Sequence, residues 1–209
     1  MPQTAQQKSQ DTPTGSTPHV PALVEKARAG SRIAFEQLVD LFQEDIFRTV
    51  YYRTRSHMDA EDLTQEIFIK AFKNLSGLKA FDRFRSWLYS IAINRVRDFN
   101  RKKRFRALFG TFSDSDEVIQ SDTEINDHPE ALTGLMRQDF WKQVRLLLDK
   151  LSRLEREVFL LRFMDHLSIR EISQVMAKSE STIKTHLYRA LKKFKKDASL
   201  IQFLQEESA

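Results

Sequence analysis

Apolar side chains recur at helical spacing in three consecutive segments of the N-terminal half of the chain. Residues three or four positions apart lie on one face of an α-helix, so each segment predicts a helix with a buried face. Asp59 precedes the second segment and is a candidate N-cap for its helix. The three faces are Phe35, Leu38, Val39, Phe42, Ile46 and Val50; Leu63, Ile67, Phe68, Ala71, Phe72 and Leu75; and Phe84, Leu88, Ile91, Ala92, Val96 and Phe99. Together they predict one helical bundle over residues 22–108.

Shorter helices with clear start signals follow in the C-terminal part. In the S-x-x-E capping box, a serine and a glutamate side chain each accept from the other residue's backbone N–H. Two pairs fit this pattern, Ser152 with Glu155 and Ser168 with Glu171. Ser179 is a candidate cap for a last helix, whose apolar face is Ile183, Leu187, Ala190, Leu191 and Phe194. These signals predict a second helical domain over residues 136–200.

Composition changes sharply between and outside the two predicted domains. From Thr111 to Phe140 there are eight acidic residues and one basic residue, so residues 109–135 are predicted to form a flexible acidic linker. Four of the five prolines lie in the first twenty-one residues, which predicts a disordered polar leader over 1–21; residues 201–209 are left as a tail. No alternating apolar pattern bounded by hairpin turns is present. The predicted fold class is therefore all-α, with two small helical domains.

The composition also narrows the class of function. The chain has no cysteine, which excludes thiolate zinc sites and cysteine nucleophiles and favours a reducing, cytoplasmic setting. No apolar run approaches membrane-spanning length. The five histidines are scattered and no glycine-rich phosphate loop is present, so we predict neither an enzyme nor a metal or other cofactor. The net charge of +5 is compatible with a polyanionic partner.

Residues 168–196 have the pattern of a helix-turn-helix. A short helix from Ser168 to Met176 is followed by a turn and then by a longer basic helix. The apolar stripe of the last helix can anchor it, while short polar and long basic side chains project outward, as a reader of the DNA major groove requires. A plain helical hairpin with a solvated basic face is the alternative, and the capping signals favour DNA binding.

Two further surface clusters have both a functional and an ordinary interpretation. Cations beside exposed aromatic rings can bind phosphates and unpaired bases, although this cluster taken alone fits core rings beside a solvated charge run better. This basic cluster is Arg95, Arg97, Arg101, Lys102, Lys103, Arg104 and Arg106, with Trp87, Tyr89, Phe99 and Phe105. On the second predicted helix, an outward face opposite the apolar stripe fits a protein partner or solvent. Its members are Asp62, Gln65, Glu66 and Ile69.

Three segments, in this order, resemble conserved regions of the sigma-70 family of bacterial transcription initiation factors. Residues 59–68 (DAEDLTQEIF) resemble region 2.2, and residues 84–94 (FRSWLYSIAIN) resemble the promoter-melting segment. Residues 154–162 (LEREVFLLR), with 179–190, resemble region 4. Two domains joined by a linker, without region 1.1 or domain 3, are similar to the extracytoplasmic-function (ECF) group.

The resemblance implies a sigma factor that brings core RNA polymerase to promoters and promotes formation of the open complex. Residues 22–108 would be sigma domain 2, and residues 136–200 would be sigma domain 4. Core polymerase would dock on Asp62, Gln65, Glu66 and Ile69. Recognition and melting of the −10 element would involve Trp87, Tyr89, Asn94, Arg95, Arg97 and Arg101. The −35 duplex would be read by Ser181, Thr182, Lys184, Thr185, Tyr188 and Arg189.

Some positions depart from the family pattern. Thr64 stands where an aliphatic residue is common, Lys178 where a small hydrophobe is common, and His186 where arginine is frequent, so the −35 sequence preference does not carry over. The main alternative function is a helix-turn-helix regulator with a non-sigma N-terminal domain, which would share the C-terminal pattern but would need a dimer and a palindromic site. The sequence leaves open whether an anti-sigma factor is a further partner.

Overall fold

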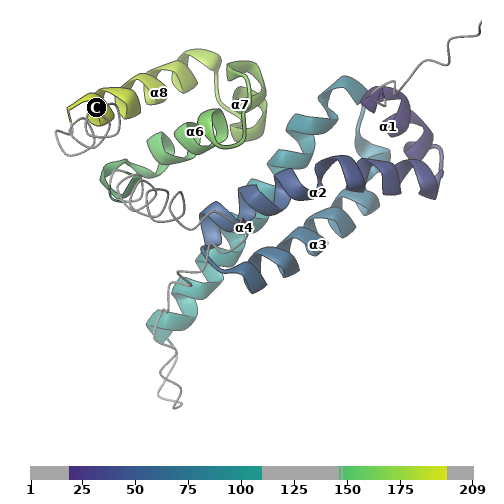
Figure 1. Ribbon diagram of the computed structural model, residues 1–209, viewed down its shortest axis with the longest axis horizontal. Helices are drawn as coiled ribbons and strands as arrows, with labels where there is room; N and C mark the ends of the chain where they lie inside the picture. The colour runs from purple at the N-terminus through teal and green to yellow at the C-terminus, as the bar shows by residue number, and fades with distance from the viewer. Residues whose placement is uncertain (1–18, 110–145, 147, 197–209) are drawn as a thin grey trace, which may run out of the picture.

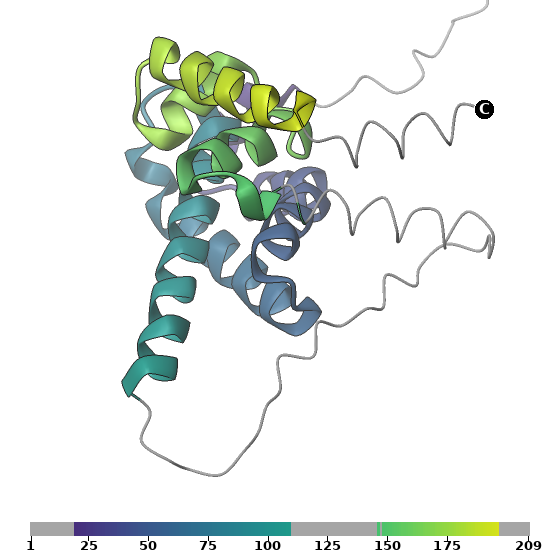
Figure 2. The same ribbon diagram turned by 90° about the vertical axis from the view of Figure 1, so that its left-hand side faces the viewer.

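The computed structural model describes residues 19–109, 146 and 148–196 (Figures 1 and 2). Every regular element in these ranges is a helix, which confirms the predicted all-α class. Most of the predicted leader, almost all of the acidic linker and the C-terminal tail lie outside the described residues. Among the helices that are described, none is both long and apolar enough to cross a membrane.

Four helices form the N-terminal domain, coloured purple to teal in Figure 1. They are α1 (Val20–Arg28), α2 (Arg32–Thr54), α3 (His57–Asn74) and α4 (Phe84–Phe109), and two short 3₁₀ turns, η1 (Leu75–Gly77) and η2 (Phe81–Arg83), connect α3 to α4. The predicted domain boundary at residue 22 falls inside α1. The C-terminal part of α4 projects beyond the other helices in both views, and its side chains from Arg101 to Ala107 are exposed.

The junction between α2 and α3 is set by two consecutive residues. Arg55 takes a left-handed conformation (φ 59°) and its N–H donates to Tyr51 O at 2.8 Å, which ends α2. Ser56 is extended, and its side chain accepts from Asp59 N at 3.2 Å. The N-cap of α3 is therefore Ser56, so the prediction that Asp59 caps this helix is wrong. Asp59 lies in the first turn instead, where a carboxylate interacts favourably with the helix dipole.

The described part of the C-terminal domain contains α6 (Arg153–Phe163), α7 (Ile169–Met176) and α8 (Glu180–Lys195), and helical residues 148–150 precede α6. Both predicted capping boxes are present, at the starts of α6 and α7. The buried Glu155 carboxylate also accepts from Lys193 Nζ of α8 at 2.7 Å. The hydrogen bond from Lys193 is the largest cause that lowers the pKa of Glu155, and it outweighs the opposing effect of burial. One carboxylate thus ties the start of α6 to α8.

The hydrophobic core runs through both domains. One cluster joins buried residues of α1–α4 to Val158, Leu161, Leu167, Ile172, Val175 and Ile183 of the C-terminal domain, and α7 packs directly against α4. A smaller cluster inside the C-terminal domain contains Leu148, Leu151, Phe159, Leu160 and Ala190. There, the rings of Phe159 and Phe194 stack with their centroids 4.4 Å apart. The two domains are therefore docked on each other through a continuous apolar core.

Candidate nucleic-acid and protein interfaces

The helix-turn-helix is held by local hydrogen bonds around the turn between α7 and α8. Ala177 ends α7 in a left-handed conformation (φ 50°). Ser173 Oγ then donates to Lys178 O at 2.6 Å, and the Ser179 side chain accepts from Thr182 N at 3.3 Å to start α8. These contacts satisfy backbone groups that a helix end leaves free, so they fix the direction of α8 relative to α7.

The two faces of α8 divide as the sequence predicts. Ile183 and Ala190 are buried against the domain. Five of the six residues predicted to read the −35 duplex are exposed on the other side: Ser181, Lys184, Thr185, Tyr188 and Arg189. The sixth, Thr182, is half-buried and contacts the cap, since its hydroxyl lies 2.8 Å from Ser179 Oγ. Tyr188 is 67% exposed, so its side chain is accessible to a partner.

The residues predicted for the −10 element lie along α4 but have different surroundings. Asn94, Arg97 and Arg101 are exposed, and the Asn94 side-chain oxygen accepts from Arg97 Nη1 at 3.3 Å. Arg95 donates to the Glu66 carboxylate of α3. Glu66 belongs to the predicted polymerase face of α3. This ion pair therefore links that face to the predicted −10 surface of α4, although the sequence predicts them as two separate surfaces.

The two aromatic residues predicted for the −10 element are not free platforms in this arrangement. Trp87 is half-buried, and its ring centroid lies 5.8 Å from that of Phe84. Tyr89 has no exposed surface, which corrects the expectation of an open stacking ring. Burial, followed by the negative charges of Asp165 and Asp45, raises the pKa of Tyr89 to about 12. Asp165 belongs to the C-terminal domain, so domain docking contributes to the surroundings of this ring.

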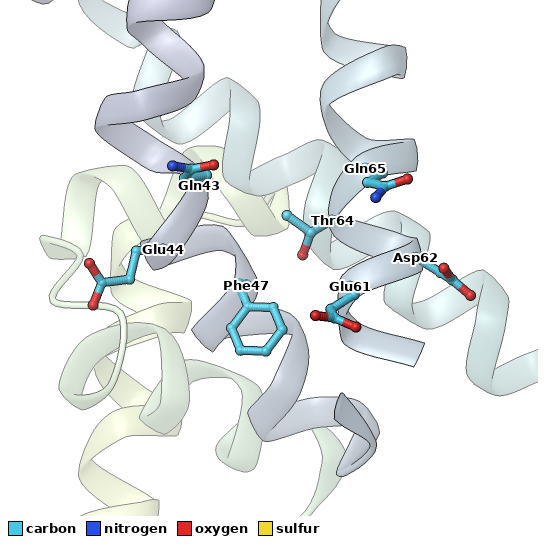
Figure 3. Close-up of a pocket in the computed structure, with 7 residues that line it drawn as sticks. All are labelled: Gln43, Glu44, Phe47, Glu61, Asp62, Thr64 and Gln65. Atoms are coloured by element: carbon cyan, nitrogen blue, oxygen red, sulfur yellow. The ribbon is translucent and has the colours of Figure 1, made fainter. Parts of the chain in front are cut away.

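The residues of the predicted polymerase face are all exposed on α3. Asp62, Gln65, Glu66 and Ile69 are exposed, whereas Leu63 and Ile67 are buried. A shallow groove adjoins this face, and Figure 3 shows that residues from both α2 and α3 line it. Its lining is Gln43, Glu44, Phe47, Glu61, Asp62, Thr64 and Gln65. The α2 residues were not predicted, because nothing in the local pattern pairs them with α3.

Metal chemistry finds no support in the part of the chain that the structure describes. Within it, no group of three or more histidine, cysteine, aspartate or glutamate side chains could hold a metal ion. The surfaces described above are the polar and basic face of α8 and the acidic groove between α2 and α3, which lies beside the exposed Ile69. Such surfaces are suited to binding polyanions and proteins.

Comparison with known families covers both domains. Residues 38–106 match the family described as Sigma-70 region 2, and residues 141–194 match the family described as Sigma-70, region 4. A probable RNA polymerase sigma factor from Haemophilus influenzae is 32% identical over 142 residues, which are 63% of this chain and 72% of that protein. The chain belongs to the sigma-70 family. It is an RNA polymerase sigma factor for transcription initiation, which is a non-enzymatic function.

The group within the family follows from further relatives. The ECF RNA polymerase sigma factor BldN of Streptomyces coelicolor is 35% identical over 173 residues, which cover 81% of this chain and 62% of that relative's length. The fold is similar to that of the sigma factor RpoE of Bartonella quintana, which was solved in complex with the anti-sigma factor NepR. The TM-score is 0.58 and the sequence identity is 24%, and the match covers 82% of this chain and 96% of that one. This sigma factor is therefore of the ECF group. The match of residues 38–106 to region 2 argues against the alternative of a regulator with a non-sigma N-terminal domain.

Proposed function

We propose that this sigma factor contacts the promoter through α8 and the exposed face of α4, and core RNA polymerase through the acidic face of α3. The observation that carries the proposal is the outward face of α8. There, four residues that match family positions for the −35 element (Lys184, Thr185, Tyr188 and Arg189) are exposed together on the second helix of a helix-turn-helix. In that motif the second helix enters the major groove and its N-terminal part contacts base edges.

The surface proposed for the −10 element contains fewer residues than the sequence predicts. Asn94, Arg97 and Arg101 lie exposed along α4, where an amide can bond a base edge and guanidinium groups can hold phosphates. Trp87 can offer part of its ring. The sequence contains no nucleotide-hydrolysing motif, so the free energy for strand separation would come from capturing unpaired bases, with about 1–3 kcal/mol for each stacked base.

The surface proposed for core polymerase is Asp62, Gln65, Glu66 and Ile69. Carboxylates are poor partners for DNA phosphates, so an exposed acidic face in a DNA-binding protein favours a protein partner. Ile69 is 54% exposed next to these polar residues, which gives the face an apolar centre with a polar rim, as protein interfaces commonly have.

Charge reversal at Asp62 tests this surface. We expect Asp62→Lys to weaken the affinity for core polymerase by about 10-fold, because a complementary charge at the interface becomes a like charge. Glu66 is a poorer choice, since its reversal would also release Arg95. The measurement is a fluorescence competition assay with purified core enzyme. The matched control is Glu25→Lys, the same change at an exposed residue of α1; equal affinities for both variants would refute the assignment.

Two further proposals concern the location of the protein and an additional partner. We infer a cytoplasmic location, which the absence of cysteine and the membership of the sigma family support. We also propose that an anti-sigma factor binds this chain. Support comes from the fold match to the Bartonella quintana sigma factor, which was solved with an anti-sigma factor bound.

A further inference from the structure

A groove with an apolar base and cationic walls lies where the two domains meet. It has a volume of about 540 Å³ and is lined by the end of α2, by α4 and by residues 148–160. Its apolar residues all belong to the buried core, so the base of the groove is the edge of that core; they are Ile93, Val96, Leu148, Leu151 and Leu160. Pockets for small molecules commonly measure about 300–1,000 Å³ and combine apolar walls with a few polar groups.

The charged side chains that line this groove are mainly cations. Two carboxylates also line it, and the first of them, Asp149, is shared between two arginines. It lies 3.1 Å from Arg156 Nη2 and 3.7 Å from Arg55 Nη2. Arg156 also donates from Nε to Leu148 O at 2.8 Å, which fixes its guanidinium at the groove. The lining cations are Arg53, Arg55, Arg97, Lys103, Arg104, Arg153 and Arg156.

The second lining carboxylate, Glu157, belongs to a largely buried set of ion pairs. It accepts from Arg53 Nε at 2.8 Å, and Arg53 Nη2 donates to Asp165 at 2.9 Å. Burial acts to lower the pKa of Arg53, but the charges of Glu157 and Asp165 outweigh it and raise that pKa above its usual value. Because both lining carboxylates are paired with arginines, the remaining cations set the electrostatic potential of the groove, which favours an anion.

Three arginines at the groove have no carboxylate partner among the residues that the structure describes. They are Arg97 and Arg104 of α4 and Arg153 at the start of α6, and all three are exposed. Arg97 donates to the side-chain oxygen of Asn94 and Arg104 to the carbonyl of Asn100, each at 3.3 Å. A guanidinium group matches the geometry of a phosphate, to which it can donate two parallel hydrogen bonds. Several such groups around one groove suit a ligand with more than one phosphate.

We propose that this groove binds a nucleoside di- or triphosphate, with the phosphates on Arg104, Arg153 and Arg156 and the base on the apolar residues beneath them. A free phosphate would leave the apolar base of the groove uncovered, and an apolar ligand would leave the arginines without a partner. The volume of the groove fits one nucleotide rather than a strand. The site goes beyond the proposed function, since only Arg97 belongs both to the groove and to the surface proposed for the −10 element.

Isothermal titration of the full-length protein with adenosine diphosphate and with guanosine diphosphate is the first test. We expect at least one of them to bind with a Kd on the order of 1–100 μM. Because the ligand binds the folded protein, Tm should rise by about 5 °C or more at about 100 times that Kd. Inorganic pyrophosphate and the free nucleoside each fill only part of the groove, so each should bind at least about 10-fold more weakly than the nucleotide.

Variants of the unpaired arginines locate the binding. Arg104→Ala and Arg153→Ala should each weaken nucleotide binding by about 10-fold, because each removes charge-assisted hydrogen bonds to a phosphate. Arg153→Lys should recover part of the loss, since lysine keeps the charge but not the paired donors. The matched control is Arg170→Ala, which removes an exposed arginine of α7 that does not line the groove. It should leave nucleotide binding unchanged, and all four variants should keep normal helicity.

Three results would overturn the inference. The first is no binding of either nucleotide at about 1 mM. The second is pyrophosphate that binds as tightly as the nucleotides, which would show a cluster of cations without a nucleotide site. The third is a nucleotide affinity that Arg104→Ala and Arg153→Ala leave unchanged while both weaken binding of a single-stranded oligonucleotide, which would assign the groove to nucleic acid. None of these variants alters a residue of the surfaces proposed for core polymerase or the promoter, so that proposal stands or fails independently.

Discussion

Replacing Trp87 and Asn94 together by alanine is expected to block open-complex formation on linear promoter DNA while leaving polymerase binding intact. Asn94 is exposed on α4, and its amide would bond the edge of an unpaired base. Losing one stacked base and one such bond would remove about 2–4 kcal/mol of the free energy with which the protein binds the unpaired strand. That corresponds to a loss of roughly 30-fold to 1,000-fold in open complex. The measurement is permanganate reactivity of unpaired thymines.

Two controls separate melting from folding in this experiment. Trp87 packs against the core, so the single change Asn94→Ala, which removes no packing, should reproduce part of the loss. Asn74→Ala, an exposed asparagine on α3, should have no effect. A template with a pre-melted bubble should partly rescue the double variant. Normal opening of linear DNA by the double variant, or equal failure on the bubble, would show that these residues do not carry melting.

Arg189→Ala is expected to lower the preference of the protein for its −35 duplex by about 10-fold to 100-fold. Arg189 is exposed on the outer face of α8, and a bidentate contact to a base edge contributes about 1–3 kcal/mol of discrimination. Lys192→Ala and Lys195→Ala should instead weaken binding to all sequences mildly. Each lost phosphate contact should reduce the slope of log affinity against log salt by about 1.

The measurement for these variants is binding to the −35 duplex and to a scrambled duplex at several salt concentrations. The matched control is Arg170→Ala, an exposed arginine on α7 rather than α8, which should change neither preference nor slope. If Arg189, Lys192 and Lys195 all give the same small effect on both duplexes, α8 does not read the base sequence.

Features set by neighbours in the sequence could be predicted without the structure. The capping boxes at Ser152 and Ser168 are formed by residues three positions apart, and they are present. The two faces of α8 follow from the helical period alone. The N-cap of α3 was predicted wrongly because Asp59 and Ser56 are both good caps. The choice depends on Arg55, whose left-handed conformation the pattern does not indicate.

Features set by residues distant in the sequence could not be predicted in this way. Arg53 and Asp165 are separated by 112 positions, and Arg95 and Glu66 by 29. No periodicity or local motif marks either pair. The burial of Tyr89 has the same origin, because its surroundings include the C-terminal domain. The family resemblance identified the segment to which Tyr89 belongs, but a resemblance in sequence does not say which surfaces are docked in the free protein.

Transcription reconstituted from core polymerase and this purified protein tests the central claim most directly. The template is a pool of linear genomic fragments, and the readout is the mapping of start sites against core polymerase alone. We expect new starts that share one sequence motif near −10 and a second near −35, both lost with Arg189→Ala combined with Asn94→Ala. An absence of new starts, or a single palindromic motif bound without polymerase, would contradict the claim that this chain directs initiation through two separate promoter contacts.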